Sequence, residues 1–320
     1  MCALKNMPTP FDQSQEVASA GEWAARHETP KRSVFGNYPT DPRVSAEAAL
    51  DPDDIPAQPS PTGKDEVPPR TAIDFAVARS YVYRFLAVAF GDPTTAGWQW
   101  LTETATIAGM RSATQTLGGP LPALVQSLLS SLESTGLEPF LNAYLAAFGH
   151  AARGSCPLNE IEYGDIKADP LFQPHRLADL AAFYRAFGLE VAEDAGERQD
   201  HICLELEFMC VLAAKEGYAW DKQLDTDQLE QCREAQEKFL REHLGRWAPA
   251  FSRRLAAATQ EGTLVALAAF TRAFVESDCA KFKVASGSED LLLRPVDEAA
   301  ERMCDGCGIL NLPPGAMAST

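Results

Sequence analysis

The sequence has no apolar run long enough to span a bilayer, because its most apolar stretch, residues 75–90, is interrupted by Arg79 and Arg84. Its first residues, MCALKNMPTPFDQ, also lack the apolar core of a secretory signal. Cysteines are sparse, since eight are spread over 320 residues and do not reach the density of a secreted disulfide scaffold. These absences favour a cytoplasmic protein with reduced thiols.

The common motifs of catalysis are missing as well. The chain contains no Gly-rich phosphate loop, no GxSxG and no HExxH. A di-iron site in a helical bundle requires paired Glu-x-x-His motifs on separate helices, and the sequence offers none. His201 and Glu205 are four residues apart and could touch on one helix, but this spacing favours an ion pair over a metal site. We therefore expect no cofactor.

Basic residues are few compared with acidic ones. The 28 Lys and Arg residues face 45 Asp and Glu residues, which gives a formal net charge of −17. Such a surface repels phosphate backbones and anionic lipids, so neither nucleic-acid nor membrane binding is expected. The same charge would attract a basic peptide or protein partner, although it could also serve solubility alone.

The chain divides into three parts by composition. Residues 1–70 hold 11 of the 22 prolines and no periodic apolar pattern, which predicts a disordered extension. From Thr71 onward, apolar residues recur every three or four positions, and the period-2 alternation of strands is absent. This pattern predicts an all-α, bundle-like domain of roughly eight to ten helices over residues 71–285, followed by a Cys-containing tail over 286–320. Helices are expected at residues 71–90, 120–135, 136–149, 174–188, 227–244 and 263–282, with a loop over 150–173.

The tail carries a CxxC pair, Cys304 and Cys307, within MCDGCGIL. One such pair is half of a zinc site or a redox pair, and Cys279 or Cys156 could supply further ligands. Nothing in the spacing requires either function, so ordinary reduced thiols are the favoured interpretation.

Residues 196–208 read GERQDHICLELEF, in which polar residues open an otherwise apolar helical pattern. Asp200 and His201 stand four and seven residues before Leu204 and Phe208, so both lie on or beside the face expected to be buried. Asp194 and Glu197 have the spacing of a capping box, which predicts the start of the helix there. Asp200 and His201 therefore form either a site or a helix cap.

Four segments, taken in order, carry a resemblance to a known family. They are RSYVYRFLAVAFGDP in the first helix, CPLNEIEYG in the loop, LADLAAFYRAFGLE in the next helix, and ERQDHICLELEFM. The last has the pattern Glu-x-x-Asp-His followed by Glu-x-Glu-Phe. These motifs resemble those of the TorD/DmsD/NarJ family of redox-enzyme (molybdoenzyme) maturation chaperones, and the resemblance covers residues 71–285.

The resemblance implies a TorD-like helical chaperone and not an enzyme. Members of this family bind the twin-arginine signal peptide, or the apo form, of the catalytic subunit of a molybdopterin oxidoreductase in the cytoplasm. They assist insertion of the molybdenum cofactor and prevent premature export, and enzymes of the dimethyl-sulfoxide-reductase type are the expected clients. A twin-arginine peptide is basic and then apolar, so it fits an acidic rim beside an apolar helical groove.

The resemblance also suggests where a client binds. The predicted client-binding residues are Asp200, His201, Glu205, Tyr163, Glu160 and Tyr83. Asp200 would accept hydrogen bonds from a client arginine, and His201, held by Glu205, would orient the site. Glu160 and Tyr163 would form the rim of the groove, and Tyr83 its first-helix side.

Two other functions remain open at this point. One is a structural helical subunit of an oxidoreductase complex. The other is an enzyme that uses Asp200 and His201 as an acid–base pair.

Overall fold

The computed structural model describes residues 4–6, 69–149, 154–164, 172–193, 195–224 and 226–294. Most of the expected N-terminal extension and most of the tail, including Cys304 and Cys307, lie outside the described residues.

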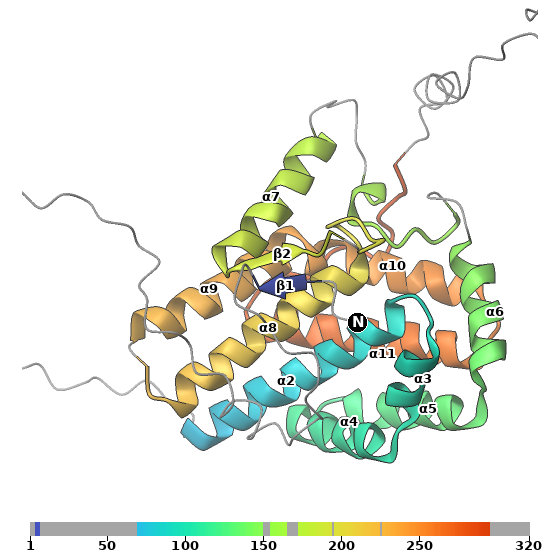
Figure 1. Cartoon of the computed structure of the whole chain (residues 1–320), viewed down its shortest axis with the longest axis horizontal. Helices are drawn as coiled ribbons and strands as arrows, with labels where there is room; N and C mark the ends of the chain where they lie inside the picture. The colour runs from blue at the N-terminus through green and yellow to red at the C-terminus, as the bar shows by residue number, and fades with distance from the viewer. Residues whose placement is uncertain are drawn as a thin grey trace, which may run out of the picture.

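Helices dominate the described part of the chain, as the sequence predicts (Figure 1). The α-helices are α2 (Pro69–Phe90), α3 (Thr95–Thr102), α4 (Thr104–Leu117), α5 (Leu121–Ser134), α6 (Leu137–Phe148), α7 (Phe172–Ala186), α8 (Ile202–Asp221), α9 (Thr226–Glu242), α10 (Leu244–Ala258) and α11 (Gly262–Lys281). A 3-10 turn, η1 (Glu160–Glu162), and two short strands, β1 (Leu4–Asn6) and β2 (Leu189–Val191), complete the described elements. The all-α class and the expected number of helices are confirmed.

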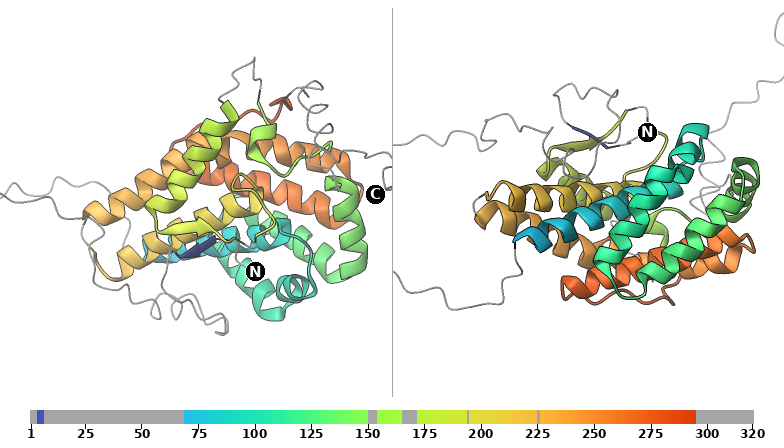
Figure 2. Two further views of the ribbon diagram at one scale, coloured as in Figure 1. Left: turned by 45° about the horizontal axis from the view of Figure 1, so that its top comes forward. Right: turned by 90° about the horizontal axis from the view of Figure 1, so that it is seen from below.

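The centre of the domain is a long contact between α2 and α8, which lie side by side in both Figure 1 and Figure 2. Val82 and Leu86 of α2 and Leu204 and Phe208 of α8 are fully buried. Burying each such side chain stabilises the fold by about 1.5–3 kcal/mol. Around this pair, α4 covers α2, α9 packs on α8, and α10 pairs with α11. The apolar residues that recur along the sequence therefore pack into one continuous core.

A buried ionic cluster joins three of these helices. Arg79 on α2 donates two hydrogen bonds to Asp278 on α11, at 2.5 and 2.7 Å, and one to Glu216 on α8, at 2.9 Å. Tyr83, one turn along α2, donates to the same Asp278 carboxylate at 2.5 Å. Although burial opposes it, the carboxylates of Asp278 and Glu216 raise the pKa of Arg79 above its ordinary value. The guanidinium therefore stays charged inside the core.

The two strands are a difference from the sequence-based expectation, which contained none. β1 pairs antiparallel with β2, with Leu4 opposite Val191 and Asn6 opposite Leu189. Segments of three residues are too short to show alternation, so no pattern in the sequence announces them. Leu4 is 7% exposed and packs against the core. Residues 4–6 are therefore an ordered part of the segment that was expected to be disordered.

The described chain also continues past the expected boundary at residue 285. Gly287 donates its N–H to the carbonyl of Gly245 at 2.9 Å, and Arg294 donates its N–H to that of Glu162 at 2.8 Å. A Cβ on Gly287 would lie 1.8 Å from the Arg246 carbonyl oxygen, so this close approach requires glycine. Residues 284–294, which we call the C-terminal segment, thus lie against α10 and against the loop over residues 154–164 that contains η1, which we call the η1 loop.

The start of α8 differs from the prediction as well. The helix begins at Ile202 with His201 as its N-cap, so the capping box predicted from Asp194 and Glu197 is wrong. The residues before His201 instead form a turn, in which His201 donates its N–H to the Arg198 carbonyl at 2.9 Å. Among the described helices, none is both long and apolar enough to cross a membrane.

Candidate functional site

The loop over residues 154–164 and the segment before α8 are connected through their backbones. Glu160 donates its N–H to the Asp200 carbonyl at 2.9 Å, and Ile202 donates to the Leu158 carbonyl at 2.9 Å. Asn159 and His201 form an isolated antiparallel bridge between these two bonds. The two motifs that resemble the chaperone family, one in the loop and one before α8, are therefore in direct contact.

Asp200 fastens this contact with its side chain. The carboxylate, fully buried, accepts two hydrogen bonds from Arg198, at 2.5 and 2.9 Å. It also accepts one from the Asn159 amide at 3.1 Å and one from the backbone N–H of Ile161 at 3.2 Å. Four donors thus surround a single carboxylate, and two of them belong to the loop. Asp200 holds the loop against the start of α8.

His201 caps α8 through its imidazole. Its Nδ1 accepts the backbone N–H of Cys203 at 3.3 Å and lies 2.9 Å from the Cys203 thiol. Burial lowers the pKa of His201 from 6.5 to about 4, so the ring is neutral at physiological pH and can accept at Nδ1. The expectation that Glu205 holds His201 is wrong. The ring bends back onto the first turn of α8, and Glu205 bonds elsewhere.

Glu205 points into the core beneath the loop. Its Oε2 accepts the indole N–H of Trp247 on α10 at 3.0 Å, while Oε1 has no hydrogen-bond partner. Burial, followed by the nearby charge of Glu160, raises the pKa of Glu205 well above its ordinary value. This environment favours the protonated carboxyl group, which is a structural role and not that of an acid on an open surface.

Glu160 is the centre of a second set of ion pairs. Its carboxylate lies 2.9 Å from Nδ1 of His243, 3.1 Å from Nη2 of Arg246 and 3.5 Å from Nη1 of Arg176. The other ring nitrogen of His243 lies 3.2 Å from Asp179 of α7. Because Arg176 and Asp179 belong to α7 and His243 precedes α10, these pairs connect the loop with both helices.

Tyr163 ends the loop in the same cluster. Its hydroxyl donates to the Pro157 carbonyl at 2.7 Å, and its carbonyl accepts from the Arg246 guanidinium at 3.2 Å. Its ring lies 5.0 Å from that of Trp247, which also bonds Glu205. We call this set the loop–helix network: the residues of 157–163, Asp200, His201, Glu205, His243, Arg246 and Trp247.

The structure brings together five of the six predicted site residues and places the sixth elsewhere. Asp200, His201, Glu205, Glu160 and Tyr163 lie in the loop–helix network. Tyr83 lies in the ionic cluster of Arg79 and Asp278. All six are buried, and the most exposed of them, His201, is 8% exposed. The expectation that Glu160 and Tyr163 form an accessible rim is therefore wrong, while the influence of all six residues on a client stays a prediction.

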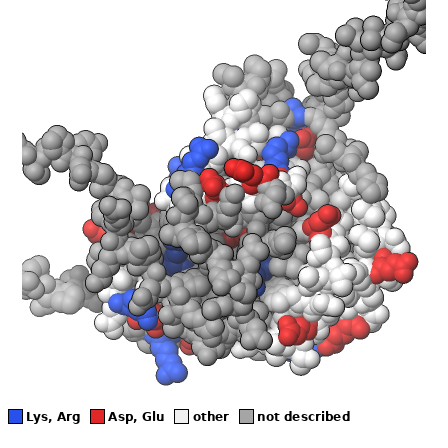
Figure 3. Space-filling model, in the orientation of Figure 1, with Lys and Arg blue, Asp and Glu red and all other residues white. Residues whose placement is uncertain are grey.

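The accessible acids on this side of the molecule are other residues, which the sequence analysis missed. Glu193 is exposed, Glu190 and Glu197 are half-buried, and the Asp179 side chain is 43% exposed. Figure 3 shows acidic side chains near β2 and the loop after it, with basic ones at the border. The run EVAEDAGE was the available signal. Arg246 and His243, which pair with Glu160, carried no such signal in the sequence, because they stand more than 80 residues after it.

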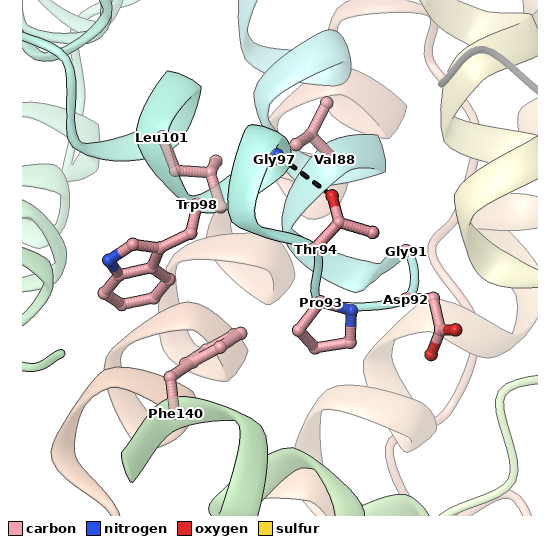
Figure 4. A pocket seen from close by; sticks show the side chains of 9 residues that line it. All are labelled: Val88, Gly91, Asp92, Pro93, Thr94, Gly97, Trp98, Leu101 and Phe140. Atoms are coloured by element: carbon pink, nitrogen blue, oxygen red, sulfur yellow. Dashed lines mark hydrogen bonds between the residues drawn. The ribbon is translucent and has the colours of Figure 1, made fainter. Parts of the chain in front are cut away.

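A small pocket marks the Pro-bearing turn that follows α2, away from the loop–helix network (Figure 4). Trp98 of α3 and Phe140 of α6 line it with ring centroids 5.0 Å apart. Thr94 caps α3 by accepting the Gly97 N–H at 3.0 Å. The pocket lining is mixed, since the Asp92 carboxylate and the Thr94 hydroxyl stand beside apolar side chains. The turn itself belongs to the first family motif.

The cysteines of the described chain do not gather into a metal site. Among described residues, no group of three His, Cys, Asp or Glu side chains is arranged to hold a metal ion. Cys279 is buried, and burial raises the pKa of its thiol to about 12, as it does for Cys156. The candidate ligands Cys304 and Cys307 lie outside the described residues.

Comparison with known proteins finds relatives of this chain. Residues 112–253 match the family described as nitrate reductase delta subunit. The perchlorate reductase assembly chaperone protein of Dechloromonas aromatica (strain RCB) is 27% identical over 208 residues, which cover 64% of this chain and 90% of that protein. The selenate reductase assembly chaperone protein of Thauera selenatis is 31% identical over 185 residues, covering 58% and 80%. The chaperone protein TorD of Vibrio cholerae serotype O1 (strain M66-2) is 28% identical over 120 residues, covering 37% and 52%.

Residues 112–253, which match the family, contain both motifs that meet in the loop–helix network, and the relatives are named as assembly chaperones of reductases, which gives the class of the protein. The chain belongs to the TorD/DmsD/NarJ family of assembly chaperones. Its role is therefore that of a chaperone and not of an enzyme, which confirms the expectation from the motifs.

Proposed function

We propose that this chaperone acts in the cytoplasm on the catalytic subunit of a molybdopterin-containing oxidoreductase. It binds the twin-arginine signal peptide or the apo-protein, keeps the subunit competent for insertion of the molybdenum cofactor, and prevents premature export. The observation that carries the proposal is the match to relatives named as assembly chaperones of perchlorate and selenate reductases. Since both substrates are oxyanions, an oxyanion reductase is the client class that we favour.

Charge supports a basic client segment. The chain has a net charge of −17, and Asp179, Glu190, Glu193 and Glu197 lie around the loop–helix network with accessible carboxylates. Complementary charge speeds association and selects the partner more than it raises affinity. A peptide that begins with an arginine pair fits this face by that criterion.

The buried motif residues have a positioning role in this proposal. Asp200, His201 and Glu160 connect the η1 loop to α7, α8 and α10 and thereby fix where the accessible acids stand. The accessible acids around the network make the direct contacts with a client arginine, because their carboxylates reach solvent and the buried motif residues do not. The family motif then stabilises the shape of the binding face.

A peptide-binding experiment tests the role of the acids. The triple variant Glu190→Gln, Glu193→Gln, Glu197→Gln removes three charges from this face. A matched control, Glu133→Gln, Glu234→Gln, Glu237→Gln, removes three half-exposed or exposed charges from α5 and α9. The probe is a fluorescent 20-residue peptide with an Arg-Arg pair followed by an apolar run, measured by anisotropy.

The first variant should bind the probe at least about 10-fold more weakly, with a smaller salt dependence, while the control binds like the parent chain. Equal weakening in both variants would show that only net charge matters.

Co-purification tests the larger proposal: a chaperone should accompany the cofactor-free catalytic subunit and leave the mature enzyme. Stable retention in the mature enzyme would instead indicate a structural subunit.

A further inference from the structure

The short strand β1 occupies one edge of β2 and comes from the far N-terminal end of the described chain. Its three residues pair in antiparallel register, with Leu4 opposite Val191, Lys5 opposite Glu190 and Asn6 opposite Leu189. The next described residue along the chain is Pro69. In the described part of the chain the sheet has these two strands alone. Without β1, this edge of β2 would present unpaired backbone groups.

Two further contacts hold β1 in place. The Leu4 side chain is 7% exposed and packs against the hydrophobic core. The Leu4 N–H donates to Oε2 of Glu207 on α8 at 3.0 Å. The edge of β2 therefore accepts an extended backbone, while the face of α8 offers one apolar position and one carboxylate acceptor. The leucine contact depends on the sequence of the occupant, whereas the strand pairing and the bond to Glu207 use its backbone.

The occupant is short, since β1 has three residues. A three-residue strand is near the lower limit of strand length, and a two-stranded ribbon is marginally stable by itself. Burial of one leucine side chain and a few backbone hydrogen bonds must offset the entropy of ordering the segment. β1 is therefore a weakly held occupant that a longer extended segment can replace.

The position of this edge connects it with client binding. β2 leads through Glu193 and Glu197 to Asp200, so the edge continues directly into the acidic face. Glu190 lies within β2 itself, and Glu207 already accepts a backbone N–H from the occupant. The occupant reads Leu-Lys, an apolar residue beside a basic one, which is the chemistry that this acidic surrounding favours.

We propose that the β2 edge is a strand-addition site for an extended, basic-apolar segment of the client, and that residues 4–6 are an internal placeholder which the client displaces. This inference rests on the proposed function, because it names the place and the regulation of client binding. Its consequence is that the backbone groups on this edge of β2 are paired in the absence of a client.

A reversible cross-link in the full chain tests the displacement. Lys5→Cys with Glu190→Cys introduces thiols at residues that are directly opposite in the sheet. Opposite residues of antiparallel strands have Cα atoms about 4.5–5.5 Å apart, which is within the range of a disulfide. Oxidation locks β1 on β2, and dithiothreitol releases it. Mass spectrometry identifies the bridge, which is needed because the chain has eight cysteines of its own.

The probe is the fluorescent Arg-Arg peptide described above. The oxidised double variant should bind it at least about 10-fold more weakly than the same protein after reduction. Each single-cysteine variant should show no dependence on reduction. Equal affinity in the locked and released forms, with binding present in both, would overturn the β2 edge as the client site while leaving the chaperone function intact. Absence of binding in every form, including the parent chain, would refute the proposed peptide binding and this inference together.

A second variant approaches the placeholder from the other side. Leu4→Asp removes its buried anchor and should strengthen binding of the probe several-fold, because the client no longer competes with β1. The matched control is Leu224→Asp, since Leu224 lies after α8 and is 39% exposed. Weaker binding by the Leu4 variant would show that β1 contributes to the client site and would overturn its role as a placeholder.

Discussion

Replacement of Asp200 by alanine tests whether the family motif is architecture. The side chain accepts four hydrogen bonds, and each has a different cost when lost. The buried N–H of Ile161 would be left without an acceptor, which costs about 2 kcal/mol, and loss of the bond from Asn159 costs about 1 kcal/mol. Arg198 is 43% exposed and can return to water, so its ion pair contributes about 1 kcal/mol at most.

These contributions give a destabilisation of about 4 kcal/mol. For a domain of this size each kcal/mol lowers the melting temperature by about 2–4 °C, so the expected decrease is about 8–16 °C. Thermal unfolding followed by far-UV circular dichroism measures it. The control Asp221→Ala removes a surface carboxylate paired with Lys222 and should change the melting temperature by no more than about 2 °C.

Client binding must be measured on the same protein below its melting temperature. If Asp200 positions the loop, affinity for the Arg-Arg peptide should decrease together with stability. A decrease below about 2 °C in the melting temperature, with affinity lost, would refute the positioning role and restore Asp200 as a direct contact to the client.

Two more predictions concern buried charge. Arg79→Met leaves the carboxylates of Asp278 and Glu216 buried without their cation and should destabilise the domain by about 3–5 kcal/mol. Arg111→Met is the matched change at a half-exposed arginine 3.9 Å from Glu133 and should have almost no effect in urea unfolding; similar midpoints for the two variants would contradict this reasoning. Burial lowers the pKa of His201 from 6.5 to about 4, so the unfolded chain takes up the proton first as the pH falls between these values. From pH 7 to pH 4 the parent chain should therefore lose about 3 kcal/mol more stability than His201→Asn, which keeps a capping oxygen, and parallel pH profiles would contradict it.

The helical fold was predictable because apolar periodicity is a local property. The helix expected at residues 71–90 and the one closed by Gly188 correspond to α2 and α7. Gly188 has φ of 76°, a conformation that glycine adopts without strain. The Arg79–Asp278 pair could not be predicted, because its partners stand 199 residues apart and each looks like an ordinary charged residue in its own helix.

The proximity of the two motifs was predictable, and their burial was not. The motif residues from Asp200 to Glu205 and the loop from Glu160 to Tyr163 do meet, as the resemblance implied. Their burial depends on Arg246, His243 and Trp247, and α10 was not among the helices expected from the sequence. A polar motif therefore looked like an accessible site because the side chains that cover and satisfy it come from elsewhere in the chain.

The contacts of the C-terminal segment limit when the client-binding face can form during synthesis of the chain. The loop at Glu162 receives its backbone partner from Arg294, and Gly164 donates its N–H to the Leu292 carbonyl at 2.8 Å. Leu4, by contrast, precedes the loop in the chain and is synthesised before it. The face that we assign to client binding therefore draws on residues that are made before, within and after the loop. A nascent chaperone has its placeholder before it has the loop, and the loop gains its last backbone partner only after residue 294 has emerged.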